Sequence, residues 1–236
     1  MPMTCLQMVQ TACKRIGILS PNVAVQSSDQ QITQLLALME EEGQEGAWRA
    51  QWTGVQVEAV FTTVASENQG SLDTIAPSCS YIVNDTIWNR TLRRPVYGPK
   101  SEQDWQQSKA MQINGPFNSF RLQRNNLYFY PAPVAGQTCA FEYITTNWIS
   151  TLNGSTSETW TNDGDKPLID DKVLILGTIW RWKAAKGLDY AEDFVKYERR
   201  ITDAMARNGS KPILNTNGAQ YDIQPIVLVP RGSWGV

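Results

Sequence analysis

Hydrophobic residues near the start of the chain recur with the period of an α-helix. Thr4 is a suitable N-cap, the apolar residues after it are three or four apart, and Gly17 ends the pattern. A second stripe of this kind starts after Ser28 or Asp29 and runs to Trp48. Each stripe covers only one side of its helix. Both helices must therefore bury a face against another element.

In the middle of the chain, the hydrophobic pattern changes from the period of a helix to a period of two residues, which is that of a β-strand. Apolar and polar residues alternate from Val55 to Phe61, as in a half-buried strand. The pair Asn125-Asn126 tolerates positive φ and predicts a hairpin. A short helix is predicted to start near Ser101. Further strands are expected at residues 81–83, 86–88, 96–97, 117–122, 127–130 and 138–145.

Helical spacing returns in the last third of the chain. It is preceded by residues 150–165, which are rich in Ser, Thr, Asn and Gly and predict a long exposed loop. Asp170 or Asp171 then caps one helix, and Asp189 caps another that ends near residue 208.

The last segment, residues 210–236, contains prolines, glycines and short apolar patches without a sustained period. An apolar segment of this kind is expected to lie as an extended arm on another subunit or partner. The alternative is a terminus without fixed structure. Residues 228–233, LVPRGS, match a thrombin-cleavage linker, but no histidine tag accompanies them, which favours native sequence.

These elements predict an α+β fold. The economical arrangement is a helical bundle formed by the N- and C-terminal helices, with an inserted antiparallel β-domain and an extended C-terminal arm. The predicted domains are residues 1–52 for the first helices, 53–150 for the β-rich domain, 151–209 for the loop and last helices, and 210–236 for the arm.

Composition narrows the classes of function. The formal net charge is -2 and charges of both signs are mixed along 236 residues, which argues against a general binder of nucleic acid or of an anionic membrane. No apolar run approaches the roughly 20 residues of a membrane span, and the start of the chain is not typical of a signal peptide. We therefore expect no membrane partner and a protein that is made in a cytosol.

The chain contains no histidine, which excludes Ser-His-Asp and Cys-His nucleophiles and HExxH zinc sites. Its four cysteines are scattered without a CxxC pair, so they are expected to be small buried apolar groups. We expect no metal site and no cofactor.

Carboxylates remain as the acid and base groups for hydrolysis. They are densest at Glu40, Glu41, Glu42 and Glu45, and next at Asp163, Asp165, Asp170 and Asp171. A glycosidase needs two carboxylates across a cleft. A run of Glu on a helix is more typical of a solvated face, and Asp at a helix start is more typical of a cap. No catalytic residue is assigned, and the chain is not expected to be an enzyme.

A basic cluster lies in residues 90–100. Arg90, Arg93 and Arg94 are close to Trp88 and Tyr97, a combination that can bind phosphates or an acidic protein surface. No nucleotide-binding loop accompanies it. The near-neutral overall charge favours a protein interface over contact with nucleic acid.

Four stretches carry a family resemblance. YIVNDTIWNRTLRRPVYGP (residues 81–99), GPFNSFRLQRNNLYFYPAP (115–133), FEYITTNW (141–148) and LIDDKVLILGTIWRWKAAKGLDYAEDFVKYE (168–198) resemble head-to-tail adaptor proteins of tailed bacteriophages, particularly the tail accessory factors of short-tailed phages. The resemblance covers nearly the whole chain.

The resemblance implies a structural virion protein at the head-tail junction, assembled in the host bacterial cytoplasm. It implies a ring, usually twelvefold, that joins the portal protein to tail or nozzle proteins and continues the channel for DNA, which passes without sequence-specific binding. Arg90, Arg93 and Arg94 would contact an acidic partner or the tail. The arm would contact the portal or a neighbouring adaptor through Ile213, Leu214, Tyr221, Ile226, Val227 and Trp234.

Two alternatives stay open beside the adaptor. One branch of the family has been suggested to hydrolyse the peptidoglycan of the cell wall, which would require a carboxylate pair that the sequence does not identify. The other alternative is a generic intracellular protein-binding module, which predicts a stable monomer.

Overall fold

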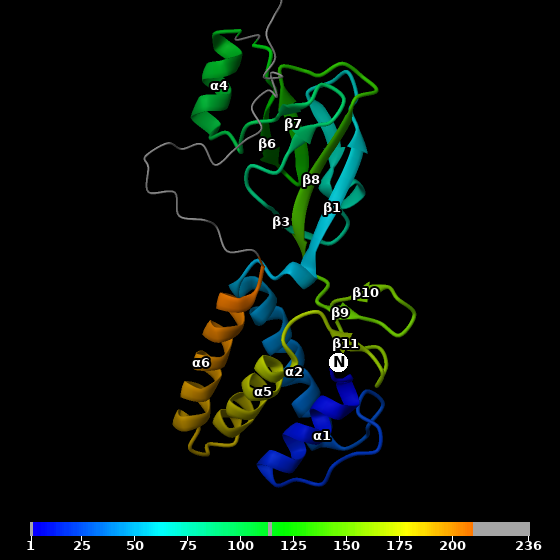
Figure 1. Cartoon of the computed structure of the whole chain (residues 1–236), viewed down its shortest axis with the longest axis vertical. Coiled ribbons are helices and arrows are strands. Elements are labelled where there is room, and N and C mark those ends of the chain that lie inside the picture. Colours follow the sequence, from blue (N-terminus) through cyan, green and yellow to red (C-terminus); the bar gives the residue numbers. More distant parts are fainter. Residues whose placement is uncertain (1, 113–114, 210–236) are drawn as a thin grey trace, which may run out of the picture.

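The computed structural model describes residues 2–112 and 115–209, and the predicted α+β fold is confirmed. Helices from both ends of the chain form one part of the molecule and antiparallel strands form the other, stacked along the long axis (Figure 1). Each part has its own hydrophobic cluster. The four long helices that share the first cluster are α1 (Cys5–Ile16), α2 (Gln30–Arg49), α5 (Asp171–Ala185) and α6 (Ala191–Arg207).

The ends of α1 and α2 follow the predicted signals. The Thr4 side chain accepts from the backbone N–H of Gln7, the Gln7 side chain accepts from the N–H of Thr4, and Gly17 ends α1 with φ 78°. Asp29 is the N-cap of α2. Local capping therefore determines these three helix ends.

Helix α5 lies between the other helices and contacts α1, α2 and α6. Trp182 is buried, while Trp180 stacks edge-on against Phe194 of α6 with ring centroids 5.2 Å apart. Gly177 leaves room for α2, because a Cβ there would lie 2.2 Å from the Glu42 side chain. The chain's own helices thus cover α5 on several sides.

The larger sheet has the strand order β1-β8-β4-β5, and β3 also pairs with β8. A short 3₁₀ turn at Thr53–Val55 leads from the helices into β1. Strands β1 and β8 pair over seven residues, from Gln56 opposite Ile144 to Thr62 opposite Thr138. The bounds are β1 (Gln56–Thr62), β3 (Cys79–Ile82), β4 (Trp88–Asn89), β5 (Arg94–Pro95) and β8 (Thr138–Thr145).

The second sheet contains the predicted hairpin. Its strands are β2 (Asn68–Ser71), β6 (Ser119–Gln123) and β7 (Asn126–Tyr130), in the order β2-β7-β6. The residues with positive φ are Arg124 and Asn125, because Asn126 already pairs with Gln123 in the ladder. The predicted helix is α4 (Glu102–Ala110), capped by Ser101. Strand β2 and the short helix α3 (Leu72–Ile75) were not predicted.

The long exposed loop predicted at residues 150–165 is only partly confirmed: most of its residues are exposed and irregular, but Trp160 and Asp165 are buried and a short strand pairs within it. The segment carries a small sheet of β9 (Ile149–Ser150), β10 (Thr156–Ser157) and β11 (Lys166–Pro167) that lies beside the helices (Figure 1). Trp160 is buried against Trp148, with ring centroids 5.1 Å apart. The polar composition of the segment gives no sign of this packing, because Trp160 is its one large buried apolar side chain.

Two aspartates hold this segment in place. Asp165 is completely buried and accepts hydrogen bonds from the N–H groups of Leu152, Thr161 and Asn162. The carboxylate of Asp163 accepts from the backbone N–H groups of residues 24 and 25, at 2.8 to 3.2 Å. Short polar side chains therefore replace the hydrophobic periodicity that a packed element usually shows.

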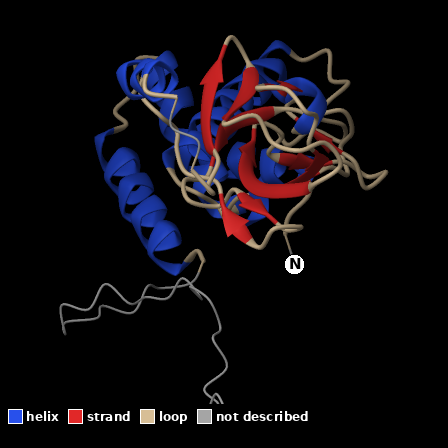
Figure 2. Cartoon of the chain, turned by 90° about the horizontal axis from the view of Figure 1, so that it is seen from above, coloured by secondary structure: helices blue, strands red, loops and turns tan. Residues whose placement is uncertain are grey.

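Seen along the long axis, the strands lie in front of the helical part (Figure 2). Over residues 2–112 and 115–209, none of the helices combines the length and the apolar character that crossing a bilayer requires. The six residues predicted to anchor the arm, from Ile213 to Trp234, lie outside the described residues.

Candidate functional site

A groove of about 1170 Å³ lies on the β part of the molecule. Strands β1, β4, β5 and β8 supply half of its lining residues, and the rest come from the loops beside β4 and β5 and from residues 116 and 117. The three arginines predicted from the sequence, Arg90, Arg93 and Arg94, all line this groove.

The turn between β4 and β5 presents these arginines. The side chain of Asn89 is buried, donates to the Gln137 Oε1 at 2.7 Å and accepts from the backbone N–H of Leu92 at 2.9 Å. Arg93 follows in the left-handed conformation with φ 56°, which turns the chain back into β5. One buried amide thus fixes a turn whose exposed side chains are basic.

The three guanidinium groups differ in what they contact. Arg90 forms an ion pair with Glu58 of β1. Arg94 donates to the carbonyl of Pro116 at 3.0 Å and lies over the Phe117 ring. Within the part of the chain that the structure describes, Arg93 has neither an ion pair nor a side-chain hydrogen bond. Arg93 is therefore the cation that the groove offers to a ligand.

Acidic and aromatic side chains complete the groove. Glu58 lies directly opposite Glu142 across the β1–β8 pair, and the Gln56 amide donates to Glu142. Tyr97 and Phe117 pack edge to face with ring centroids 5.6 Å apart, and both are exposed. Partly exposed aromatics beside arginine are typical of protein interfaces.

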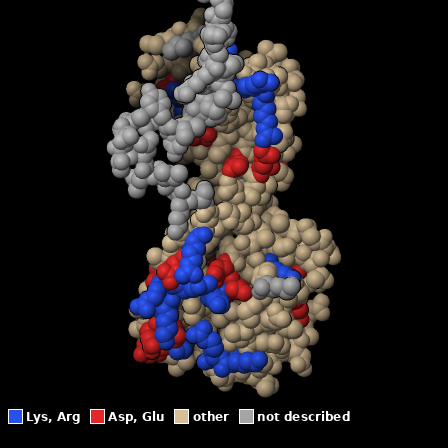
Figure 3. All heavy atoms as spheres, in the orientation of Figure 1, with Lys and Arg blue, Asp and Glu red and all other residues tan. Residues whose placement is uncertain are grey.

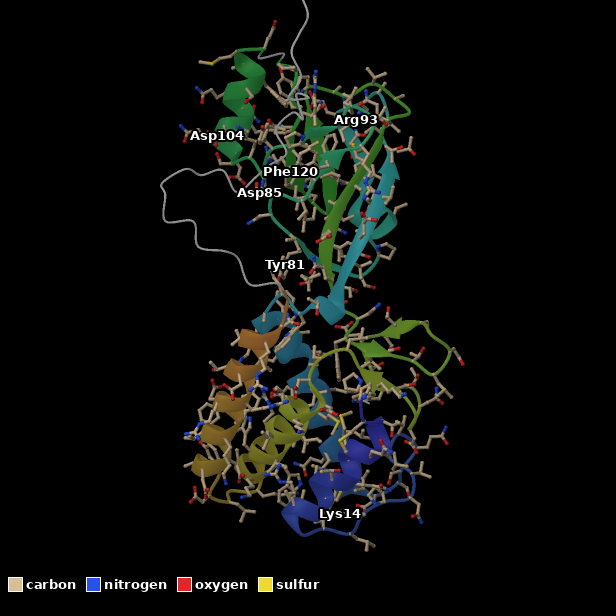
Figure 4. The ribbon with its side chains drawn as sticks, viewed as in Figure 1. Lys14, Tyr81, Asp85, Arg93, Asp104 and Phe120 are labelled. Atoms are coloured by element: carbon tan, nitrogen blue, oxygen red, sulfur yellow. The ribbon has the colours of Figure 1, made fainter. Side chains whose placement is uncertain are left out.

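Figure 4 places Arg93 and Asp85 on the β part, away from the four long helices of the other part. Both residues line the groove and both are exposed. The groove therefore carries charges of both signs and an apolar wall. This arrangement suits a peptide or protein surface better than a uniformly anionic nucleic acid.

The acidic run on α2 is only partly the solvated face that its sequence predicts. Glu41 and Glu45 are exposed, but Glu42 is completely buried. Arg181 of α5 pairs with all three carboxylates. Burial raises the pKa of Glu42, and the hydrogen bond and the positive charge of Arg181 act against that increase. The sequence analysis missed Arg181, although an arginine within the apolar stretch LILGTIWRW signals a buried partner.

The other carboxylates accept hydrogen bonds from backbone N–H groups. Asp170 is the N-cap of α5 and also pairs with Arg200 of α6. Asp171 accepts from the N–H of Met3 at 3.3 Å, and Glu40 accepts from the N–H of Trp160 at 3.1 Å. These contacts assign structural roles to the residues that were weighed as hydrolytic.

The cysteines are free thiols, three of them buried and Cys79 partly exposed. Burial raises the pKa of Cys79 and of Cys139 to about 11, so both thiols are protonated and weakly reactive at neutral pH. Throughout the described residues, no three Cys, Asp or Glu side chains come close enough to hold a metal ion.

Comparison with known proteins identifies the family to which the chain is similar. The SU10 adaptor protein model matches residues 3–219, which is nearly the whole chain and includes both parts of the fold. No match was found among curated proteins. The match confirms the resemblance to bacteriophage adaptors that the sequence carries. The chain therefore belongs to the SU10 adaptor protein family, whose members are structural adaptor proteins of bacteriophages.

Proposed function

We propose that this protein forms a ring that joins the portal protein to the tail and continues the channel through which DNA passes. The family match over residues 3–219 carries this proposal. The proposed ring is a homo-oligomer, twelvefold as in related adaptors, that contacts DNA without reading its sequence. The ring lies at the head-tail junction of the virion, which is assembled in the host bacterial cytoplasm.

The groove beside Arg93 is the proposed contact for a tail or nozzle protein. Arg90 and Arg94 have partners within the chain, so their main role is to shape the groove, while Arg93 is available to a carboxylate of the partner. The exposed rings of Tyr97 and Phe117 supply apolar area next to that charge.

Contacts between subunits are proposed on the helical part. Trp48 at the end of α2 is 65% exposed, and Leu188 and Val195 are also exposed. Acidic and basic side chains alternate over α6 (Figure 3), as in the pair Lys196–Glu192. A mixed-charge surface with an exposed tryptophan is suited to a repeated contact between identical copies.

Residues 210–236 are proposed as the arm that contacts the portal or a neighbouring adaptor, with Ile213, Leu214, Tyr221, Ile226, Val227 and Trp234 as anchors. One arm is a weak contact by itself. Many arms that engage a ring together act at high effective concentration and make attachment nearly irreversible. The boundaries of the four predicted domains, 1–52, 53–150, 151–209 and 210–236, stay a proposal.

Light scattering coupled to size exclusion tests the function directly. We expect a ring, or a monomer that joins portal in a fixed high ratio. A variant without residues 211–236 should stay folded and lose portal binding. A full-length monomer that is indifferent to portal would contradict the adaptor proposal and favour a generic binding module.

The role is proposed to be structural and without enzymatic activity. The carboxylates first considered for peptidoglycan hydrolysis are occupied by Arg181 and by backbone N–H groups. Zymography of the intact protein beside folded Glu40→Gln and Glu41→Gln variants tests the hydrolase. A cleared band that both substitutions abolish would overturn the structural role.

A further inference from the structure

Strand β1 forms an outer edge of the larger sheet. It pairs with β8 on one side, and in the residues that the structure describes no strand pairs with its other side. Val57 and Val60 are 38% and 52% exposed. An edge of seven residues with a single charged side chain, Glu58, is long and apolar compared with the protected edges of most proteins.

The backbone groups on this edge can be assigned. Residues of a strand direct their N–H and C=O groups alternately to its two sides. The carbonyl oxygens of Thr138 and Glu142 accept from Arg90 and Val83, which lie on the side of β8 away from β1. The odd-numbered residues of β8 therefore face β1, and by the register they bond Val57, Ala59 and Phe61.

The amides of Glu58 and Val60 consequently point outward. The bond from the Thr63 N–H to the Gln137 carbonyl continues the same alternation and supports it. These outward N–H groups and carbonyls match the backbone of an added strand.

The chain leaves the described structure close to the start of β1. Asn208 accepts from the N–H and hydroxyl of Thr53 at 3.3 and 3.0 Å and donates to the carbonyl of Gln51 at 2.9 Å. Thr53 lies three residues before β1 begins at Gln56. Residues 210–236 thus start at the base of the unpaired edge.

The length and sequence of that segment fit the edge. Residues 226–229, IVLV, are its most apolar stretch and are rich in branched residues that favour strands. The leader of about 16 residues, 210–225, can span roughly 50 Å, whereas a seven-residue strand is roughly 23 Å long. The stretch can therefore reach any point along β1 of its own chain.

We propose that residues 226–229 add as a strand to the outer edge of β1 in the same chain while the subunit is unassembled. Attachment within one chain is favoured because the segment starts close to the beginning of β1, at an effective concentration that no second copy matches in dilute solution. The added strand covers Val57 and Val60 and hides the edge from other chains. Release of this strand then makes the segment available for assembly.

Amide hydrogen exchange on the full chain without portal tests the proposal. We expect the outward amides of Glu58 and Val60 to exchange at least tenfold more slowly than an unprotected amide, near the rates of Val57 and Ala59. Unprotected exchange at Glu58 and Val60 beside protected exchange at Val57 and Ala59 would overturn it.

A double variant, Ile226→Asp with Val227→Asp, should accelerate exchange at Glu58 and Val60 and leave Ala59 unchanged. Ile213→Asp with Leu214→Asp is the matched control, since it places the same two charges in the segment outside the proposed strand, and it should change neither. Protection at Glu58 that is lost on dilution would show a strand from a second copy and overturn the intramolecular assignment. These readouts do not involve portal, so failure of the adaptor function would not affect them.

Discussion

The Nε of Arg181 lies 2.9 Å from Oε2 of Glu42, a carboxylate that is completely buried between α2 and α5. The same guanidinium also bonds Glu41 and Glu45. One arginine therefore bridges three acidic side chains of α2 and reduces the repulsion between them. The helical bundle depends on this contact because neither partner is stable alone in the interior.

Replacing Arg181 with Met should destabilise the protein by about 3–5 kcal/mol, since the buried Glu42 charge loses its partner. Urea unfolding measures the loss. Arg199→Met on α6 removes an exposed arginine and should change stability by less than about 0.5 kcal/mol. A double variant with Glu42→Leu should recover part of the loss, and no recovery would contradict the buried-charge explanation.

Two glycines on α2 should respond in opposite ways to alanine. A Cβ on Gly43 would lie 2.3 Å from the Trp148 ring, whereas the nearest atom to a Cβ on Gly46 is 3.4 Å away. Gly43→Ala should cost about 1–3 kcal/mol through overpacking. Gly46→Ala should be neutral or stabilise by up to about 1 kcal/mol through helix propensity. Equal melting temperatures of the two variants would show that Trp148 can move aside.

Asp165→Asn should destabilise the packing of residues 150–165. It should also make the free energy of unfolding depend less on pH in the acid range. Burial would raise the pKa of Asp165, but the N–H groups of Asn162 and Thr161 and the Thr161 hydroxyl hold it below the usual aspartate range. A lowered folded pKa means that the stabilisation is complete above pH 4 and is lost as the pH falls through the folded pKa.

The expected loss for Asp165→Asn is about 2–3 kcal/mol at pH 7, with a smaller difference from wild type at pH 2–3. Glu158→Gln removes an exposed carboxylate from the same segment and serves as the control. Thermal unfolding at several pH values makes the comparison. A pH-independent difference would show that the charge of Asp165 has no part in its role.

Arg93→Glu should lower the affinity for the partner that enters the groove by about tenfold or more, because the unpaired cation becomes a like charge for an acidic ligand. The melting temperature should not change. Lys14→Glu reverses an exposed charge on α1, far from the groove, and should leave binding unchanged (Figure 4). Co-sedimentation with purified tail proteins measures binding, and equal affinities of both variants would exclude the groove as the contact.

Trp48→Ala should reduce self-association without loss of stability, since the side chain is 65% exposed. Mass from light scattering as a function of concentration provides the measurement. Trp182→Ala is the contrasting variant, because it removes a buried ring and should unfold the helical part first. An unchanged mass for folded Trp48→Ala would place the subunit contacts elsewhere.

Much of the fold could be predicted because its signals are local. The capping box of α1, the Asp29 cap of α2 and the hairpin at residues 119–130 each depend on residues within a few positions of one another. The grouping of Arg90, Arg93 and Arg94 in one groove also followed from their closeness in sequence. Interactions between residues that are close in sequence can be predicted from the sequence alone.

The sequence alone determined an α+β chain with helices at both ends, the absence of histidine chemistry and the resemblance to phage adaptors. Tertiary structure decided that Glu42 is buried, because its partner Arg181 lies 139 positions away. It likewise decided that residues 150–165 pack, because Trp160 meets Trp148 and Asp163 meets residues 24 and 25. Polar residues show no periodicity when they are buried by partners distant in sequence, so only the folded chain reveals these contacts.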